Sequence, residues 1–310
     1  MSIKAMAIAA VSVAAACWVM PQNVNAKDID TAYLGAPSGL SGRSDVGSGA
    51  LVHSRPWIFS APPRGKRAAE DAIYEPIARF LTQVTGHRII YRKPGNWLSY
   101  SQNMSEGKYD LVFDGPHFTS WDARYLGDTP LVRLPQPFVF AVVVRRDERF
   151  TKLRQLAGRP VCANSPPNLG TLSLLSQFSY ITRQPYLVVV HGWPASYHGL
   201  MSKRCAATVL PISNLKMYEH GAHTVRVLYR TPVYPNQALS ASPRIPKDIQ
   251  ASIQRALLSP AGRVATAALR KAYGGRGLIR ANRREYAGLS HLLDNTLYFS
   301  GGSEVGIAQR

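Results

Sequence analysis

The chain has 310 residues, enough for two domains of the usual size of about 100–200 residues each. Hydrophobic residues make up 45% and charged residues 18%, so the chain can bury a core, which excludes wholesale disorder; 24 glycines exclude a collagen-like repeat. The 37 Lys and Arg outnumber the 18 Asp and Glu, and the net charge of +19 favours an anion, an acidic membrane or nucleic acid as partner.

The N-terminus has the pattern of an export signal. Residues 5–20 read AMAIAAVSVAAACWVM, an apolar run shorter than the roughly 20 residues that span a bilayer. Small residues at Val24 and Ala26 predict signal-peptidase cleavage after Ala26 and a periplasmic mature protein. An uncleaved anchor and lipidation at Cys17 remain as alternatives. No later segment is long and apolar enough to span a membrane, so we expect no stable membrane insertion.

The rest of the chain alternates strand and helix patterns. Residues 27–54 are rich in Gly and Ser and predict a flexible leader, and 301–310 predict a frayed tail. The predicted strands are 57–60, 88–91, 109–113, 138–144, 160–163, 186–190, 207–210 and 225–229. The predicted helices are 67–84, 97–106, 152–156, 170–180, 194–203, 246–258, 261–273 and 283–294. This alternation indicates an α/β fold with mainly parallel sheets, which bind ligands at the carboxyl ends of their strands.

Export places Cys162 and Cys205 in an oxidising compartment. The strand pattern puts them at opposite ends of neighbouring strands. They either form a disulfide or remain two separate buried thiols.

Four segments, in order, resemble one family: YEPIARFLTQVTGHRIIYR, SEGKYDLVFDGPHF, FTKLRQLAGRPVCANSPPNLGT and YPNQALSASPRIPKDIQASIQRALL. Together they resemble the phosphate, phosphite and phosphonate transporter substrate-binding proteins over about residues 56–295. The resemblance implies a two-lobed type II periplasmic-binding-protein fold, with lobe 1 at 55–140 plus 236–300 and lobe 2 at 141–235. The strand 138–144 and the segment near 234–239 would cross between the lobes.

The resemblance also implies a function. A small oxyanion such as a phosphonate, phosphite or phosphate would bind between the lobes, trigger hinge closure and pass to an ABC permease. No bond is made or broken in that cycle, so we expect no enzymatic activity and no cofactor. The export signal argues against nucleic acid as a partner.

The first candidate segment of the cleft follows the strand 109–113. Its ligand-binding candidates are Gly115, His117, Thr119 and Ser120. Free backbone N–H groups at a helix start suit an anion. The family commonly has Tyr where Thr119 stands, and a hydroxyl there still donates a hydrogen bond. In the alternative interpretation, Asp114 and Thr119 only cap the helix.

Further candidates lie elsewhere in the chain. The loop before the helix at 170–180 offers Ser165, Asn168 and Thr171, although two prolines there lack N–H groups. His191 and Ser213 follow the next two strands, and Arg64 follows the first strand. Trp97 and Tyr100 would form an aromatic wall. Cys205-Ala206 stands where the family has Asp-Ala, which weakens recognition of an amino group on the ligand.

The sequence also leaves functions other than solute binding open. A binding-protein fold reused to dock on an acidic periplasmic enzyme, cytochrome or sensor kinase also fits the positive charge. His117, His191, His198 and Cys205 together could hold a metal, but their spacing fits no metal motif. A hydrolase is disfavoured, because the sequence has no GxSxG, no HExxH and no persuasive pair of carboxylates.

Overall fold

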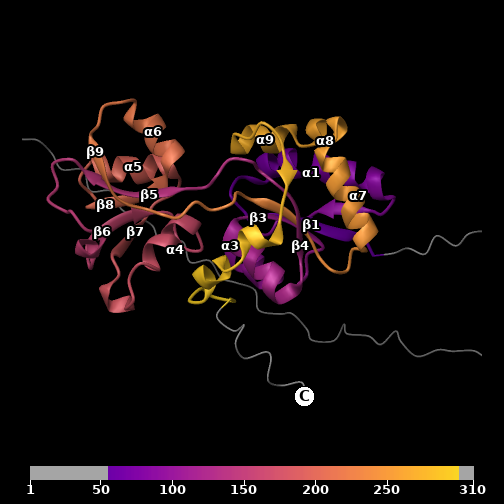
Figure 1. Cartoon of the computed structure of the whole chain (residues 1–310), viewed down its shortest axis with the longest axis horizontal. Coiled ribbons are helices and arrows are strands. Elements are labelled where there is room, and N and C mark those ends of the chain that lie inside the picture. Colours follow the sequence, from indigo (N-terminus) through magenta and orange to yellow (C-terminus); the bar gives the residue numbers. More distant parts are fainter. Residues whose placement is uncertain (1–54, 300–310) are drawn as a thin grey trace, which may run out of the picture. The chain divides into compact units, whose positions relative to one another are not determined.

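The computed structural model describes residues 55–299 of the chain. The predicted signal peptide, the leader, the tail and the lipidation candidate Cys17 lie outside the described residues. The two-lobed α/β prediction is confirmed, since the strands gather in two sheets that are each flanked by helices (Figure 1).

The first sheet has six strands in the order β11-β4-β10-β3-β1-β2. They are β1 (Trp57–Ser60), β2 (Ile89–Tyr91), β3 (Leu111–Asp114), β4 (Thr129–Arg133), β10 (Ala238–Ala241) and β11 (Ile279–Arg280). Its helices are α1 (Arg67–Thr85), α2 (Trp97–Ser105), α3 (Pro116–Trp121), α7 (Lys247–Leu258), α8 (Pro260–Ala265), α9 (Ala267–Tyr273) and α10 (Arg283–Tyr286).

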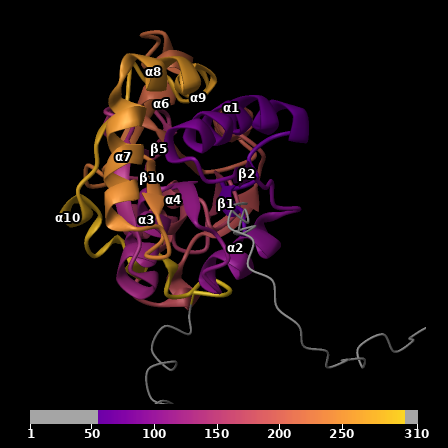
Figure 2. The ribbon, with the colours of Figure 1, turned by 90° about the vertical axis from the view of Figure 1, so that its right-hand side faces the viewer.

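Alternation along the strands gives this sheet two apolar faces. Phe59, Leu111 and Phe113 are buried in the same cluster as the inner faces of α1, α7 and α9. Ile58 and Val112 point the other way and join α2 and α3 in a second cluster. Figure 2 accordingly shows α1 and α2 on either side of β1 and β2.

The second sheet has five strands in the order β7-β6-β8-β5-β9. They are β5 (Phe140–Arg145), β6 (Pro160–Ala163), β7 (Tyr186–Val189), β8 (Ala207–Pro211) and β9 (Val225–Arg230). Its helices are α4 (Leu169–Leu175), α5 (Trp193–Met201) and α6 (Ile212–Glu219), with short 3₁₀ turns at Leu153–Leu156 and Ile181–Arg183. Val142, Val161 and Val209 share a buried cluster with α4, whereas Ala141 and Val143 pack with α5 and α6.

Both sheets are mixed rather than mainly parallel. Two pairs in the first sheet are parallel and three are antiparallel. The second sheet has two of each kind. Four of the five antiparallel pairs involve a strand at which the chain changes sheets: β5 enters the second sheet and β10 returns into the first. The fifth is the β11–β4 pair. The segments before β5 and before β10 meet at an antiparallel bridge between Phe138 and Tyr234.

Several elements differ from the sequence prediction. The sequence did not predict β4, β10, β11 and α6. The segment of β4, TPLVR, contains a proline, and the segment of β10, ALSA, lacks an apolar run. β10 is a strand because both of its edges pair, with β3 and with β4. The predicted helix 261–273 is two helices, because Thr266 leaves helical geometry and its hydroxyl donates to the Gly262 carbonyl. The predicted helix 283–294 is α10 followed by a 3₁₀ turn, Leu289–Leu293.

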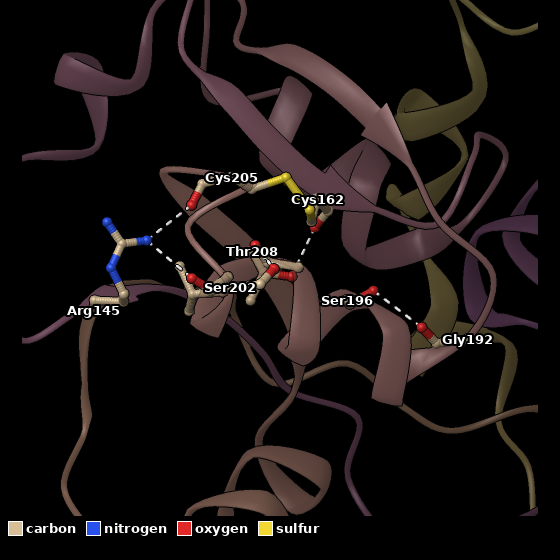
Figure 3. Close-up of a disulfide and its surroundings, with 9 residues drawn as sticks. Arg145, Cys162, Gly192, Ser196, Ser202, Cys205 and Thr208 are labelled. Atoms are coloured by element: carbon tan, nitrogen blue, oxygen red, sulfur yellow. Dashed lines mark hydrogen bonds between the residues drawn. A yellow bond between two sulfur atoms is a disulfide. The ribbon is translucent and has the colours of Figure 1, made fainter. Parts of the chain in front are cut away.

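Cys162 and Cys205 form a disulfide (Figure 3). Of the two alternatives that the sequence left open, the disulfide is confirmed. β6 and β8 are neighbouring parallel strands, and Cys205 lies two residues before β8. The Cys205 N–H donates to the Gly199 carbonyl, and the two Cα atoms lie 5.6 Å apart. Gly199 is required at this place, since a Cβ there would lie 2.4 Å from Cys162 Sγ.

The segment after α10 connects elements of both sheets. The turn Leu289–Leu293 contacts α3 and α4, and the Ser290 N–H donates to Ser120 Oγ. Phe299 is buried against the rings of Phe118 and Trp121. Within residues 55–299, no helix combines the length and the apolarity needed to cross a bilayer.

Candidate functional site

The carboxyl ends of β1 and β3 form the edge of the first sheet on which the candidate residues gather. β10 runs antiparallel to β3, so its first residue, Ala238, pairs with Asp114 and Gln237 reaches the same edge. Asp114 is completely buried. One of its oxygens accepts the Gly115 N–H at 2.6 Å and the other accepts the Tyr100 hydroxyl. Burial raises the pKa of Asp114 to about 7, although Arg64, Tyr100 and Gly115 oppose the rise.

Arg64 lies at this edge and is held by residues from distant parts of the chain. Its Nη1 donates to Gln237 Oε1 at 3.1 Å and to the Tyr273 hydroxyl at 3.0 Å. Its Nη2 lies 4.0 Å from Asp114 Oδ1. Glu70 accepts the backbone N–H groups of Arg64 and Gly65 and so fixes the loop. The guanidinium is therefore oriented before any ligand binds, and its side chain is still 30% exposed.

His117 joins the first sheet to a loop of the second. Its Nε2 lies 2.9 Å from the Pro167 carbonyl oxygen, and its ring packs on Phe118. A carbonyl only accepts, so Nε2 carries the proton of this hydrogen bond. Burial lowers the pKa of His117 to about 3, and Arg64 contributes in the same direction, so the imidazole is neutral. In the neutral ring Nδ1 is an acceptor, and it is buried without a hydrogen-bond partner among residues 55–299.

Thr119 lies two residues after His117 in α3. The residue is 1% exposed, and its hydroxyl has no hydrogen-bond partner within residues 55–299. The Thr119 N–H donates to the Gly115 carbonyl inside the helix. The hydroxyl of Ser120, by contrast, accepts the Ser290 N–H at 3.0 Å. Among the described residues, the buried side-chain polar atoms of α3 that lack a hydrogen-bond partner are thus His117 Nδ1, the Thr119 hydroxyl and the Trp121 indole N–H.

The loop before α4 uses most of its polar groups internally. Asn168 caps α4 by accepting the N–H groups of Gly170 and Thr171. The buried Thr171 hydroxyl donates to the Asn164 carbonyl at 2.6 Å. Ser165 is exposed. This loop meets α3 through the Pro167 carbonyl, and its Asn and Thr side chains stabilise the start of α4.

His191, His198 and Ser213 are exposed side chains on the second sheet's loops and helices. The structure assigns them no contact with Arg64, His117 or Thr119. The alternative metal site loses its thiolate, because Cys205 is bonded to Cys162. Among the residues from 55 to 299, no group of three or more His, Cys, Asp and Glu is arranged to hold a metal.

A cavity of about 320 Å³ adjoins the Pro167 contact. It is lined by the first turn of α2, by the two prolines and by the end of the described chain: Trp97, Leu98, Ser101, Pro166, Pro167, Asn295, Thr296, Leu297, Tyr298 and Phe299. Trp97 stacks on Phe118, with ring centroids 6.3 Å apart. The predicted aromatic wall is therefore divided, because Trp97 lines this cavity while Tyr100 is buried on Asp114.

Gln237, Tyr273 and Pro167 belong to this site but were not singled out from the sequence. Tyr273 is 209 positions from Arg64, so no local pattern connects the two. A capping role for Asp114 was only the alternative interpretation, and its bond with Tyr100 is not visible in the local pattern. The signal in the sequence that pointed to this place was the segment from Asp114 to Ser120, which follows a strand and opens a helix.

Comparison with known proteins identifies the family to which this protein belongs. Residues 59–286 match the family described as "ABC transporter, phosphonate, periplasmic substrate-binding protein". A comparison with curated protein sequences gives no match. The chain belongs to this family of periplasmic substrate-binding proteins, which serve a transporter by binding a solute and are not enzymes.

Solved structures show the same fold at low identity. A Xanthomonas citri protein solved with ATP is 14% identical over 78% of this chain and 98% of its own, with a TM-score of 0.63. PhnD1 of Prochlorococcus marinus in complex with methylphosphonate is 12% identical over 76% of this chain and 96% of its own, with a TM-score of 0.57. A binding-protein component of a phosphonate transporter from Pseudomonas aeruginosa is 11% identical over 83% and 90%, with a TM-score of 0.55.

Proposed function

We propose that this protein captures a small oxyanion of the phosphonate, phosphite or phosphate type and delivers it to an ABC permease. The anion would bind between lobe 1 (residues 55–140 and 236–300) and lobe 2 (141–235). The observation that best supports this proposal is the Arg64 guanidinium, which Gln237 and Tyr273 orient at the edge of the first sheet. An oriented, partly exposed guanidinium suits an oxyanion, because its planar fork matches two oxygens at once.

Two further groups support an anion at this edge. The Thr119 hydroxyl and His117 Nδ1 are buried without partners, and unpaired buried polar groups are costly unless a ligand or water completes them. His117 lies within electrostatic reach of Arg64, since the guanidinium affects the pKa of the imidazole. The net charge of +19 would speed the capture of an anion.

Calorimetric titration of the purified protein tests the proposal. The panel contains methylphosphonate, aminoethylphosphonate, phosphite, phosphate and sulfate, with ATP added because a similar fold was solved with it. A micromolar dissociation constant, about −8 kcal/mol, is expected for one of the phosphorus oxyanions. Absence of binding by every phosphorus oxyanion would overturn the proposal.

Arg64→Gln should weaken that binding by at least about 30-fold, because a charge-assisted hydrogen bond is lost. Arg255→Gln is the matched control. Arg255 is exposed on α7 and, within the described part of the chain, donates to Ser252 on its own helix, so this change removes the same charge away from the site. Equal effects of the two variants would show that net charge, rather than the Arg64 site, governs binding.

A further inference from the structure

His117 sets a requirement on the protonation of the ligand. Its Nε2–H is already committed to the Pro167 carbonyl at 2.9 Å. The ring therefore has a lone pair, not a proton, at Nδ1. The residue is 4% exposed, and Nδ1 has no partner among the described residues. A ligand oxygen that approaches Nδ1 must bring its own hydrogen.

The position of Nδ1 supports a role at the anion site. A Cβ placed on Gly115 would lie 3.3 Å from Nδ1, so a side chain at Gly115 would occupy the space beside this nitrogen. Arg64 acts electrostatically on the ring, and its Nη2 lies 4.0 Å from Asp114 Oδ1. When Asp114 is ionised, its carboxylate offsets part of the guanidinium charge, and a ligand that keeps one proton is then favoured over a fully ionised one.

We propose that His117 makes the site specific for oxyanions that retain an acidic proton, which they donate to Nδ1. Phosphonates and phosphate keep such a P–OH group near neutral pH, whereas sulfate and sulfonates do not. A fully deprotonated oxygen would place its lone pairs against that of Nδ1 in a buried site, where the repulsion is poorly screened. This inference rests on the proposed function and names the feature of the anion that the same site selects.

Two isosteric probes test the inference. Methylphosphonate, mostly a monoanion at neutral pH, and methanesulfonate have nearly the same shape and charge, but only methylphosphonate carries a proton. Calorimetry on the purified protein should show methylphosphonate binding more tightly by on the order of 100-fold or more, because a site that must be completed by a hydrogen-bond donor rejects the analogue that lacks it.

The affinity ratio of the two probes identifies the role of His117. In His117→Gln the side chain can present an amide N–H instead of a lone pair, and the ratio should fall below about tenfold. Thr119→Val is the matched control on α3: it removes a hydroxyl that can donate to either probe, so both should weaken together and the ratio should persist. If His117 had only a structural role, the affinity ratio would stay unchanged in His117→Gln as well, and the inference would be overturned.

The tautomer has an independent readout. Nitrogen-15 spectra of histidine-labelled protein should show His117 protonated at Nε2 only, and Nδ1 should shift on addition of methylphosphonate. Equal binding of both probes to the unaltered protein would overturn the specificity and leave the oxyanion site standing. Failure of both probes and of phosphate to bind would overturn the proposed function and the specificity with it.

Discussion

Asp114 makes the stability of the protein depend on pH in a way that one substitution isolates. A pKa of about 7 in the folded state stands against an ordinary value of 3.8 in the unfolded chain. A carboxyl whose folded-state pKa is raised stabilises the fold below its unfolded pKa, and this contribution is lost as pH rises toward the folded value. The difference corresponds to roughly 4 kcal/mol of unfolding free energy between about pH 4 and pH 7.5.

Asp114→Asn removes this titration. Urea unfolding of both proteins at a series of pH values gives the difference in unfolding free energy at each pH. That difference should move in favour of the Asn variant by roughly 4 kcal/mol as pH rises from about 4 to 7.5. Shifts from carboxyls on which Asp114 does not act, such as the buried Asp128, largely cancel in the comparison.

At low pH the folded Asp114 is a neutral carboxyl, so the Asn variant replaces one neutral group by another of nearly the same shape. The expected result is therefore the change of the difference with pH, not its absolute size. A difference that stays constant within about 1 kcal/mol across the range would refute it, because the folded-state pKa of Asp114 would then be ordinary.

Three other perturbations address the disulfide and the C-terminal segment. Replacing Cys162 and Cys205 together by Ala should lower the unfolding free energy by about 4 kcal/mol, the loop-closure value for a separation of 43 residues, and a loss under 1 kcal/mol in urea titrations would contradict this. Gly199→Ala should lower the unfolding free energy by about 1–3 kcal/mol when the disulfide is present, because its Cβ would overlap Cys162 Sγ. In the variant with Ala at both cysteine positions the loss should be much smaller, and an equal loss in both backgrounds would exclude the overlap as the cause. Phe299→Ala should lower the unfolding free energy by about 3–5 kcal/mol, since the ring is 3% exposed between Phe118 and Trp121, and an unchanged thermal midpoint would show that this contact contributes nothing.

The local sequence predicted most elements whose apolar pattern is continuous. PVCA at 160–163 and ATVL at 207–210 are strands close to their expected bounds, because β-branched and small apolar residues fill a sheet that is covered on both faces. The order of four motifs was sufficient to indicate the family. The unpredicted strand ALSA has no such pattern, and its pairing with β3 and β4 made it a strand.

Periodicity and short motifs were enough to predict the α/β class and the family, and they place the predicted anion site at the end of β3. The polar groups that remain available there follow from the three-dimensional packing. Thr171 and Ser120 have their hydroxyls paired, whereas Thr119 and His117 do not. Arg64 is oriented by Gln237 and by a Tyr 209 positions away. Hydrogen-bond partners depend on distances in space, and residue types and local spacing do not specify those distances.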